Sequence, residues 1–529
     1  MKKPARDTGK IAKSAGIVSI AVMCSRVLGL VREQVFAIMF GAGFAYDSFV
    51  VAFRIPNLLR DLFGEGALSS AFVTVFSDYD ANKGEEETWR LASNVLVFFA
   101  MLLSLVTLAG IIFAKPLILL LVDDEFALVA GKLELTRILT MVMFPFLIFV
   151  SLAAVCMGML NTKGRFFIPS MASSFFNLGS IIGGVSLALI LPKFGQPAIV
   201  GMAIGTLIGG FLQFVGQLPV LRKTGFVFTP RLNLSDPGLH RILRLMLPAV
   251  VGLSATQINI FINTRFASSC VQGSVSWLNY AFRLVQFPIG VFGVAISIAS
   301  LPLIAKYASR NDLPNLKEAY TSSLTMAFCL TIPATVGLYL LAEPIIRLIF
   351  EHGAFTAVDT TKTAEALAFY SLGIFAYSAV KIIVPVFFAL DDTRYPVIAS
   401  FIAVVMNIVV ITLTLDLFQH RAIAFATSIS MIFNFFFLSA VLYRKVKGYS
   451  LAYLAKGFGK IFLAAGIMGL WLIYLMKLLE GCLVNGIFSQ IAGLLIYIVS
   501  SVAVYGITLY ILRLRELKVL VEKLRARFT

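Results

Sequence analysis

The strongest constraint on the fold is a series of long apolar stretches that recurs along the whole chain. A membrane-spanning helix needs about 20 mostly apolar residues. Charged residues make up only 13% of the 529 residues, against about 25% in an average soluble domain. The sequence therefore predicts an all-α polytopic membrane protein with fourteen transmembrane helices, at 15–39, 46–77, 91–114, 135–160, 166–191, 197–220, 243–268, 275–305, 322–342, 364–390, 396–416, 421–443, 457–478 and 487–512.

The distribution of lysine and arginine predicts the orientation of these helices. With the N-terminus inside, the inner segments hold 29 of the 44 Lys and Arg residues and the outer connections hold 8. Because cytoplasmic loops carry an excess of Lys and Arg, we expect both termini to be cytoplasmic. The net charge of +17 is then largely a topology signal that favours anionic membrane lipid and requires no nucleic acid. The basic run 513–527 is expected to lie on the membrane surface.

A cluster of charged residues lies inside the first two predicted spans. Eight ionisable residues occur there: Arg26, Arg32, Glu33, Asp47, Arg54, Arg60, Asp61 and Glu65. An ionisable group at bilayer depth costs roughly 2.5–3.5 kcal/mol on insertion scales, so it usually faces a water-filled cavity or a partner. Arginine donates two parallel hydrogen bonds to a phosphate, so the cluster suits an anionic ligand. The alternative is a set of ion pairs that stabilises helix packing.

The carboxylates of the second span are expected to pair with arginines. On an ideal helix Asp47, Arg54, Asp61 and Glu65 lie within about 40° of one stripe, although Pro56 and Gly64 disturb it. We expect these four residues to act in charge pairing or gating.

An internal repeat relates two halves of the chain. FRIPNLLRDLFGEGALSS (53–70) aligns with FRLVQFPIGVFGVAISIA (282–299) at a constant offset of 229 positions. MLNTKGRFFIP (159–169) similarly corresponds to ALDDTRYP (389–396). Repeated halves are common in transporters. The predicted domains are an N-lobe at 1–220, an interfacial linker at 221–242, a C-lobe at 243–443, and two further helices with a basic amphipathic tail at 444–529.

Four motifs carry a resemblance to a known family. They are SRVLGLVRE (25–33), FGAGFAYDSFVVAFRIPNLLRDLFGEGALSSAFV (40–73), WLNYAFRLVQFPIGVFGVA (277–295) and ALDDTRYPV (389–397). With them the chain resembles the MurJ (MviN) family of bacterial lipid II flippases, in the multidrug/oligosaccharidyl-lipid/polysaccharide exporter superfamily. The resemblance implies two lobes around a cationic cavity, a lateral groove at helices 13 and 14 for the lipid tail, and alternating access.

The resemblance also implies site residues. The positions that match the family's essential arginines are Arg26, Arg32, Arg60 and Arg283, expected to bind substrate, and the matching acidic positions are Asp47 and Glu65. The sequence departs from relatives at Phe282, where several have aspartate, at Arg54, where others have lysine, and at Asp61, where relatives have a second basic residue. The pairing among these charges is therefore open. The roles of Lys381 and of Arg265, for which the simplest interpretation is snorkelling to the interface, are open as well.

The function expected from the resemblance is translocation of lipid II across the bacterial inner membrane for peptidoglycan synthesis, by a monomer that has no cofactor. Membrane lipids surround it, and peptidoglycan synthases are candidate partners. Three alternatives differ in class: a flippase for another polyprenyl-linked saccharide, a drug exporter, and a membrane glycosyltransferase. The arginine-rich first helix argues against a cationic-drug exporter. An enzyme would need metal-binding carboxylates at a helix end, and Asp123–Glu125 and Asp391–Asp392 are the candidates.

No metal site is predicted. The five cysteines and three histidines are dispersed along the chain, without metal-ligand spacing. Relatives can carry a sodium site between helices 7, 11 and 12. Those helices here offer the neutral ligands Gln257, Asn259, Asn263, Asn407 and Thr427, and no carboxylate lies mid-helix among them. We therefore expect no sodium coupling, and the membrane potential, worth about 2.3 kcal/mol per charge per 100 mV, as the alternative driving force.

Overall fold

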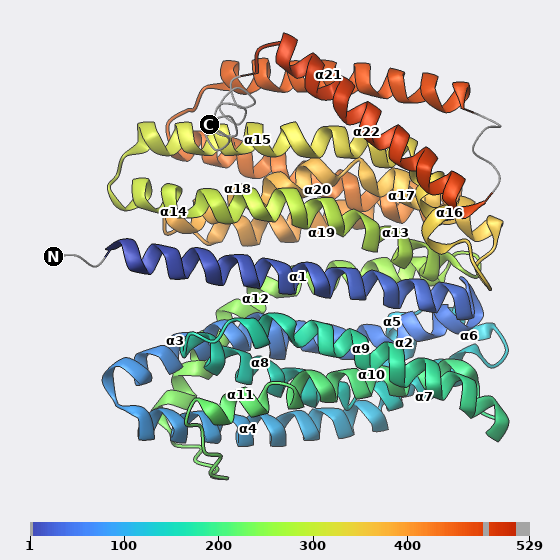
Figure 1. Ribbon diagram of the computed structural model, residues 1–529. Coiled ribbons are helices and arrows are strands. Elements are labelled where there is room, and N and C mark those ends of the chain that lie inside the picture. The colour runs from blue at the N-terminus through green and yellow to red at the C-terminus, as the bar shows by residue number, and fades with distance from the viewer. Residues whose placement is uncertain (1–3, 480–485, 515–529) are drawn as a thin grey trace. The chain divides into compact units, whose positions relative to one another are not determined.

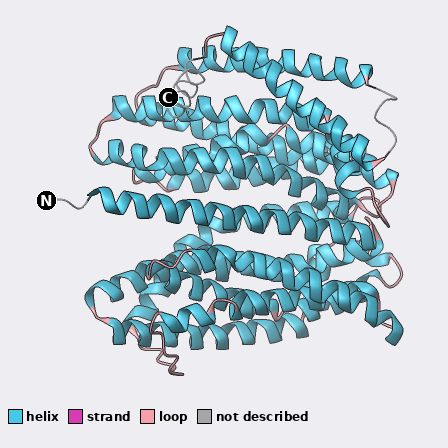
Figure 2. Ribbon diagram, in the orientation of Figure 1, coloured by secondary structure: helices cyan, strands magenta, loops and turns pink. Residues whose placement is uncertain are grey.

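The computed structural model describes residues 4–479 and 486–514, without the side chains of residues 4–20 and of Glu65. Every regular element in these residues is a helix (Figures 1 and 2). The prediction of an all-α chain is therefore confirmed. The expected surface helix at 513–527 lies almost wholly outside the described residues.

Contacts divide the chain into two compact units, residues 1–275 and 276–529. The helices of the first unit are α1 (Pro4–Phe40), α2 (Phe44–Arg60), the π-helix η1 (Asp61–Gly66), α3 (Ala67–Asn82), α4 (Glu85–Ile112), α5 (Ala114–Leu121), α6 (Asp124–Leu128), α7 (Lys132–Met143), α8 (Phe146–Thr162), α9 (Phe167–Ile190), the 3₁₀ helix η2 (Leu191–Phe194), α10 (Ala198–Val215), α11 (Leu218–Lys223) and α12 (Pro237–Ser268).

The second unit begins in the first turn of α13. Its helices are α13 (Ser274–Pro288), the π-helix η3 (Ile289–Val294), α14 (Ala295–Ser309), α15 (Leu313–Leu340), α16 (Ala342–Phe350), α17 (Ala357–Ser371), α18 (Ile374–Ala389), α19 (Arg394–Phe418), α20 (His420–Lys445), α21 (Leu451–Leu478) and α22 (Ile487–Ile511).

Eleven helical segments of the described chain are long and apolar enough to cross a membrane, or 12 if the bent pair α17–α18 is one span. These coincide with twelve of the predicted spans. The other two predicted spans are α1 and the α2–η1–α3 segment, which carry the charge cluster and are therefore less apolar than the rest. The protein is a multi-pass membrane protein, consistent with fourteen spans.

Helix boundaries in the two units repeat almost residue for residue. Helix α4 spans Glu85–Ile112 and α15 spans Leu313–Leu340, so both ends differ by 228 positions. The breaks between α7 and α8 and between α17 and α18, and the two π-helices, are also 228 positions apart. The sequence alignment predicted 229. The structure thus confirms the two related halves with a shift of one residue.

The two π-helices lie within the second and eighth predicted spans. Each lies inside a long continuous helical segment and contains glycine: Gly64 and Gly66 in η1, Gly290 and Gly293 in η3. A Cβ added at Gly66 would lie 2.1 Å from the carbonyl oxygen of Asp61 in the same π-helix. One added at Gly293 would lie 2.9 Å from the Cα atom of Ser378 on α18. Glycine therefore permits the π-turn at one position and close helix packing at the other.

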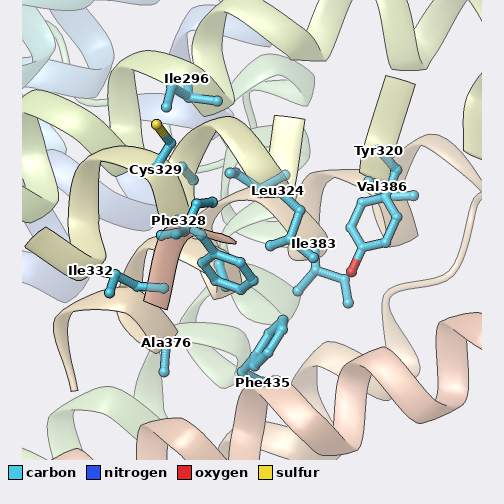
Figure 3. Close-up of a cluster of buried hydrophobic side chains, with 14 of the residues drawn as sticks. Ile296, Tyr320, Leu324, Phe328, Cys329, Ile332, Ala376, Ile383, Val386 and Phe435 are labelled. Carbon is cyan, nitrogen blue, oxygen red and sulfur yellow. The ribbon is translucent and has the colours of Figure 1, made fainter. Parts of the chain in front are cut away.

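Each unit has its own hydrophobic core. In the first unit the core joins α3, α4, α8 and the beginning of α12. In the second unit it joins α14, α15, α18, α20, α21 and α22, and Figure 3 shows part of it around Phe328, Leu324 and Ile383. The Tyr505 hydroxyl of α22 donates a 2.7 Å hydrogen bond to the Cys329 carbonyl of α15. This bond ties the last described helix to α15 within the second unit.

Helix α12 begins with Asp236 as its N-cap and Pro237 as its first residue. The Asp236 carboxylate accepts hydrogen bonds from the amides of Gly238 at 2.7 Å and Leu239 at 3.3 Å, as an N-cap does. Residues 237–242 of the predicted interfacial linker therefore belong to α12, which continues from this cap to Ser268. Helix α12 packs on α3 and η1 of the first unit. The lobe boundaries drawn from the repeat stay a prediction.

Candidate functional site

Asp47 lies at the beginning of α2 and is almost fully buried. Its Oδ2 atom accepts a hydrogen bond from Lys132 Nζ at 3.0 Å and another from the Gly273 amide at 2.9 Å. The ionic side chains of Lys132 and Asp47 are 3% and 2% exposed. Lys132 is the first residue of α7, and its ammonium group also lies 4.3 Å from the centre of the Phe126 ring. Asp47 therefore joins α2, α7 and the connection that leads from α12 to α13.

Arg32 and Glu33 on α1 form a second paired group. Arg32 Nη2 donates to Glu33 Oε1 at 2.8 Å, and the Tyr46 hydroxyl donates to Glu33 Oε2 at 2.7 Å. The Arg32 guanidinium lies over the Phe176 ring, 5.1 Å from its centre, a cation–π contact. Arg32 is thus held in place by a carboxylate and an aromatic ring.

Arg60 and Asp61 lie where α2 passes into η1. Arg60 donates to Asp61 Oδ1 through Nε at 3.2 Å and Nη2 at 2.8 Å, and Gln257 of α12 donates to Asp61 Oδ2 at 3.2 Å. Both ionic side chains are more than a quarter exposed. Asp61 follows Asp47 by fourteen positions, a rise of about 20 Å along a helix. The charged residues of the predicted stripe are therefore spread along the length of the span and do not meet at one point.

The remaining predicted residues have different surroundings. Arg26 is exposed on α1 and has no ion-pair partner among the described residues. Arg54 is half-buried on α2. The side chain of Glu65 lies outside the described residues. Arg283 belongs to the second unit, where it is exposed on α13 next to Phe282, whose ring lies 5.3 Å from that of Tyr370.

The structure also describes the two cations whose roles the sequence left open. Arg265 donates to the carbonyls of Leu120 at 3.3 Å and Val122 at 3.1 Å, at the end of α5. It therefore caps a neighbouring helix, as basic side chains do at helix C-termini. The Lys381 side chain is exposed on α18, and its carbonyl accepts a 2.6 Å hydrogen bond from Ser297.

Sequence reasoning missed Lys132, Tyr46 and the pairing role of Glu33. Lys132 precedes the apolar stretch of the fourth predicted span, which begins at residue 135. The predicted topology therefore assigns Lys132 to an outer connection and not to the membrane. The sequence does place Gly131 directly before Lys132, and in the structure this glycine has a φ of 77° and precedes the helix start. No group of three or more His, Cys, Asp or Glu residues in the described parts of the chain could hold a metal ion.

This arrangement can hold an anion without covalent chemistry. Arginines lie within an apolar helical bundle, where their attraction for phosphate is screened less than in water. One of them, Arg26, is exposed, whereas Arg32 and Arg60 are held by neighbouring carboxylates. Such carboxylates compete with an anionic ligand for the guanidinium groups.

Comparison with known proteins gives a consistent result. The family model described as "Lipid II flippase MurJ" matches residues 36–493. A probable lipid II flippase MurJ of Buchnera aphidicola subsp. Schizaphis graminum is 32% identical over 96% of this chain and 98% of its own length. The corresponding protein of Vibrio cholerae is 36% identical over 82% of each chain.

Solved structures give the same fold. A lipid II flippase MurJ in an inward closed conformation matches with a TM-score of 0.77 and 30% identity, over 94% of this chain and 99% of that one. An inward-facing multidrug transporter of the MATE family matches with a TM-score of 0.64 and 15% identity, over 79% and 99% of the two chains. The second similarity shows the fold alone.

Proposed function

Because this chain belongs to the lipid II flippase MurJ family, we propose that it moves lipid II, the undecaprenyl-pyrophosphate-linked peptidoglycan precursor, from the inner to the outer leaflet by alternating access. The observation that carries the proposal is the placement of arginines inside the membrane-spanning helices. An intramembrane charge indicates a substrate or ion pathway. The pyrophosphate of lipid II is an anion that arginine binds with paired hydrogen bonds.

Arg26, Arg32, Arg60 and Arg283 are the proposed substrate-binding residues. The exposed guanidinium of Arg26 is available to a phosphate directly. Arg32 and Arg60 hydrogen-bond to Glu33 and Asp61, so binding substrate through them requires an exchange of partners. Asp47, Arg54, Asp61 and Glu65 are the residues for charge pairing and gating.

The two last helices are the proposed contact for the lipid tail. Large apolar side chains of α21 and α22 are exposed, among them Phe462, Leu470 and Val499. A polyprenyl chain can lie against such a surface while the polar head group crosses through the protein. In this scheme residues 1–220 and 243–443 are the lobes and 221–242 the linker, and 444–529 hold the last two helices and the basic amphipathic tail.

The protein acts as a transporter and not as an enzyme in this proposal. It lies in the inner membrane with both termini in the cytoplasm, as a monomer. Peptidoglycan synthases, which use the exported precursor, are its proposed partners.

The test is replacement of the endogenous flippase of a bacterium by this chain, followed by measurement of lipid II exposed on the outer leaflet. The wild type, Arg283→Ala and the control Arg347→Ala are compared at equal membrane levels. Arg347 is an exposed arginine of the same unit that pairs with Glu343 on its own helix. We expect lipid II to appear on the outer leaflet with the wild type and with the control, and not with Arg283→Ala. No exposure with a well-inserted wild type would contradict the proposal and favour another polyprenyl-linked saccharide.

A further inference from the structure

The first unit contains an apolar cavity of about 360 Å³, apart from the charge cluster. This volume lies within the range of about 300–1,000 Å³ typical of ligand sites. Side chains of α4, α8, α10, α11 and the following connection line it: Leu96, Val97, Ala100, Met101, Leu152, Phe214, Leu218, Leu221, Arg222, Phe226 and Phe228. The lining thus combines ten apolar residues with one cation.

The cation, Arg222, lies in the last turn of α11, where the α10–α11 span ends. Its side chain is exposed, and no ion pair involves it in the part of the chain that the structure describes. No carboxylate lines the cavity. A guanidinium at the rim of an apolar cavity, at the depth of the lipid head groups, complements a phosphate.

The connection after α11 presents apolar side chains to the surroundings. Phe226 is buried edge-on against Trp89, with ring centres 5.3 Å apart. Val227, Phe228, Leu232 and Leu234 are exposed. The segment is fixed to α4, because Asn94 donates a 2.9 Å hydrogen bond to the Asn233 carbonyl and accepts one of 2.7 Å from its amide. An ordered connection with exposed apolar groups next to Arg231 suits contact with the membrane interface.

From these observations we propose that the cavity binds one anionic phospholipid of the surrounding leaflet. An acyl chain occupies the apolar cavity, and the phosphate accepts hydrogen bonds from Arg222. In the N-terminus-inside topology this is the inner leaflet, where anionic lipids are attracted to basic groups beside a span. A single guanidinium matches the single phosphate of a phospholipid better than the pyrophosphate of a polyprenyl-linked substrate. The site goes beyond the proposed transport function and does not depend on it.

The test uses the full-length protein in nanodiscs with photoreactive phosphatidylglycerol, followed by mass-spectrometric mapping of the labelled peptides. We expect labelling of segments 96–101 and 214–228. Arg222→Gln should lower the labelling about tenfold, the effect of losing one charge-assisted hydrogen bond. Lys223→Gln is the matched control, because Lys223 is an exposed neighbouring cation that does not line the cavity. It should leave the labelling unchanged.

A cavity-filling variant and two other photoreactive lipids complete the test. Ala100→Phe should reduce labelling by filling the cavity, while Arg222→Gln, at an exposed position, keeps the fold intact and tests the charge alone. Equal labelling by photoreactive phosphatidylcholine, or by the wild type and Arg222→Gln, would overturn the proposal. Preferential labelling by a photoreactive polyprenyl diphosphate would overturn it as well, in favour of the transported substrate. Since binding is measured without transport, failure here leaves the flippase proposal unaffected.

Discussion

Lys132 and Asp47, 85 positions apart in the chain, form a buried ion pair that joins the first turn of α7 to the first turn of α2. The same carboxylate accepts the Gly273 amide, so it also fixes the connection between α12 and α13. The second unit has a related contact in the first turn of α17, where the Asp359 carboxylate accepts a 2.9 Å hydrogen bond from Trp277 of α13. In both units, therefore, the span that contains the π-helix is bonded near its start to the first half of an interrupted helix, which is α7 of the α7–α8 pair in the first unit and α17 of the α17–α18 pair in the second.

Removal of one member of the Lys132–Asp47 pair should destabilise the protein strongly. Lys132→Met leaves a buried carboxylate without its cation, which costs about 3–5 kcal/mol. The double variant Lys132→Met/Asp47→Asn should lose less than Lys132→Met alone, because the introduced amide oxygen still accepts the Gly273 amide without a buried charge. Unfolding by SDS titration in mixed micelles measures the free energies of the wild type and both variants.

The control for this series is the surface variant Arg90→Gln, whose ion pairs are exposed. It should change the free energy of unfolding by about 0–1 kcal/mol. A double variant that is the least stable of the series would contradict the proposed role of the buried pair.

Arg26 and Arg32 should respond differently to loss of charge. Arg26 is a proposed substrate-binding residue, so Arg26→Gln should abolish transport. Because its side chain is exposed, thermal stability should stay at the wild-type value. Arg32→Gln also leaves Glu33 without its cation and takes the guanidinium from the Phe176 ring, so it should lower both. Lipid II exposure and the unfolding midpoint of each purified variant are the measurements. Normal transport by Arg26→Gln would exclude it from the substrate site.

The glycines of the π-helices should differ in their tolerance of alanine. Gly66→Ala and Gly293→Ala place a Cβ within 2.1 Å of the Asp61 carbonyl oxygen and 2.9 Å of the Ser378 Cα atom. Both should lower the unfolding midpoint, because backbone must move. Gly64→Ala meets its nearest neighbour at 3.5 Å and should be tolerated. Gly337, with no atom within 4 Å of an added Cβ, provides the control in α15. Equal midpoints for all four variants would show that neither the π-turn at Gly66 nor the helix packing at Gly293 needs glycine.

The ion pair between Lys445 and Asp392, a residue of the connection between α18 and α19, should stabilise the folded protein at neutral pH and lose this effect in acid. The hydrogen bond and charge of Lys445 lower the pKa of Asp392 below its usual value. A carboxyl with a lowered pKa in the folded state stabilises the protein above its unfolded pKa of about 3.9, and this contribution is lost as the pH falls through the folded-state value. Asp392→Asn should therefore lower the unfolding midpoint at about pH 7, and the difference from wild type should shrink toward zero as the pH falls below about 3. A difference that persists in acid would refute the ionic origin.

Transport should be independent of sodium. The helices that could form a sodium site here offer neutral side chains, and one of these, Gln257, donates its amide to Asp61. Replacement of Na⁺ by K⁺ at a fixed membrane potential should leave the rate of lipid II flipping unchanged. A clear loss of rate would establish a sodium site.

The sequence by itself determined the helical class, the order of the spans, the repeat, and the two spans that carry the charges. These follow from patterns local to each segment, because the free energy of transfer into the bilayer depends on about 20 consecutive residues. The N-cap at Asp236 is equally local, since a cap depends on its own first turn.

The tertiary structure alone decided which charges pair and how the long spans accommodate their glycines. The stripe predicts an arginine partner for Asp47 on the same span, but its partner is Lys132 on another helix, and Glu33 accepts from Tyr46 across a helix connection. The second span contains the π-helix η1, which shifts the stripe after Asp61. Pairing between distant residues depends on how helices pack against one another, and no pattern within one segment encodes that contact.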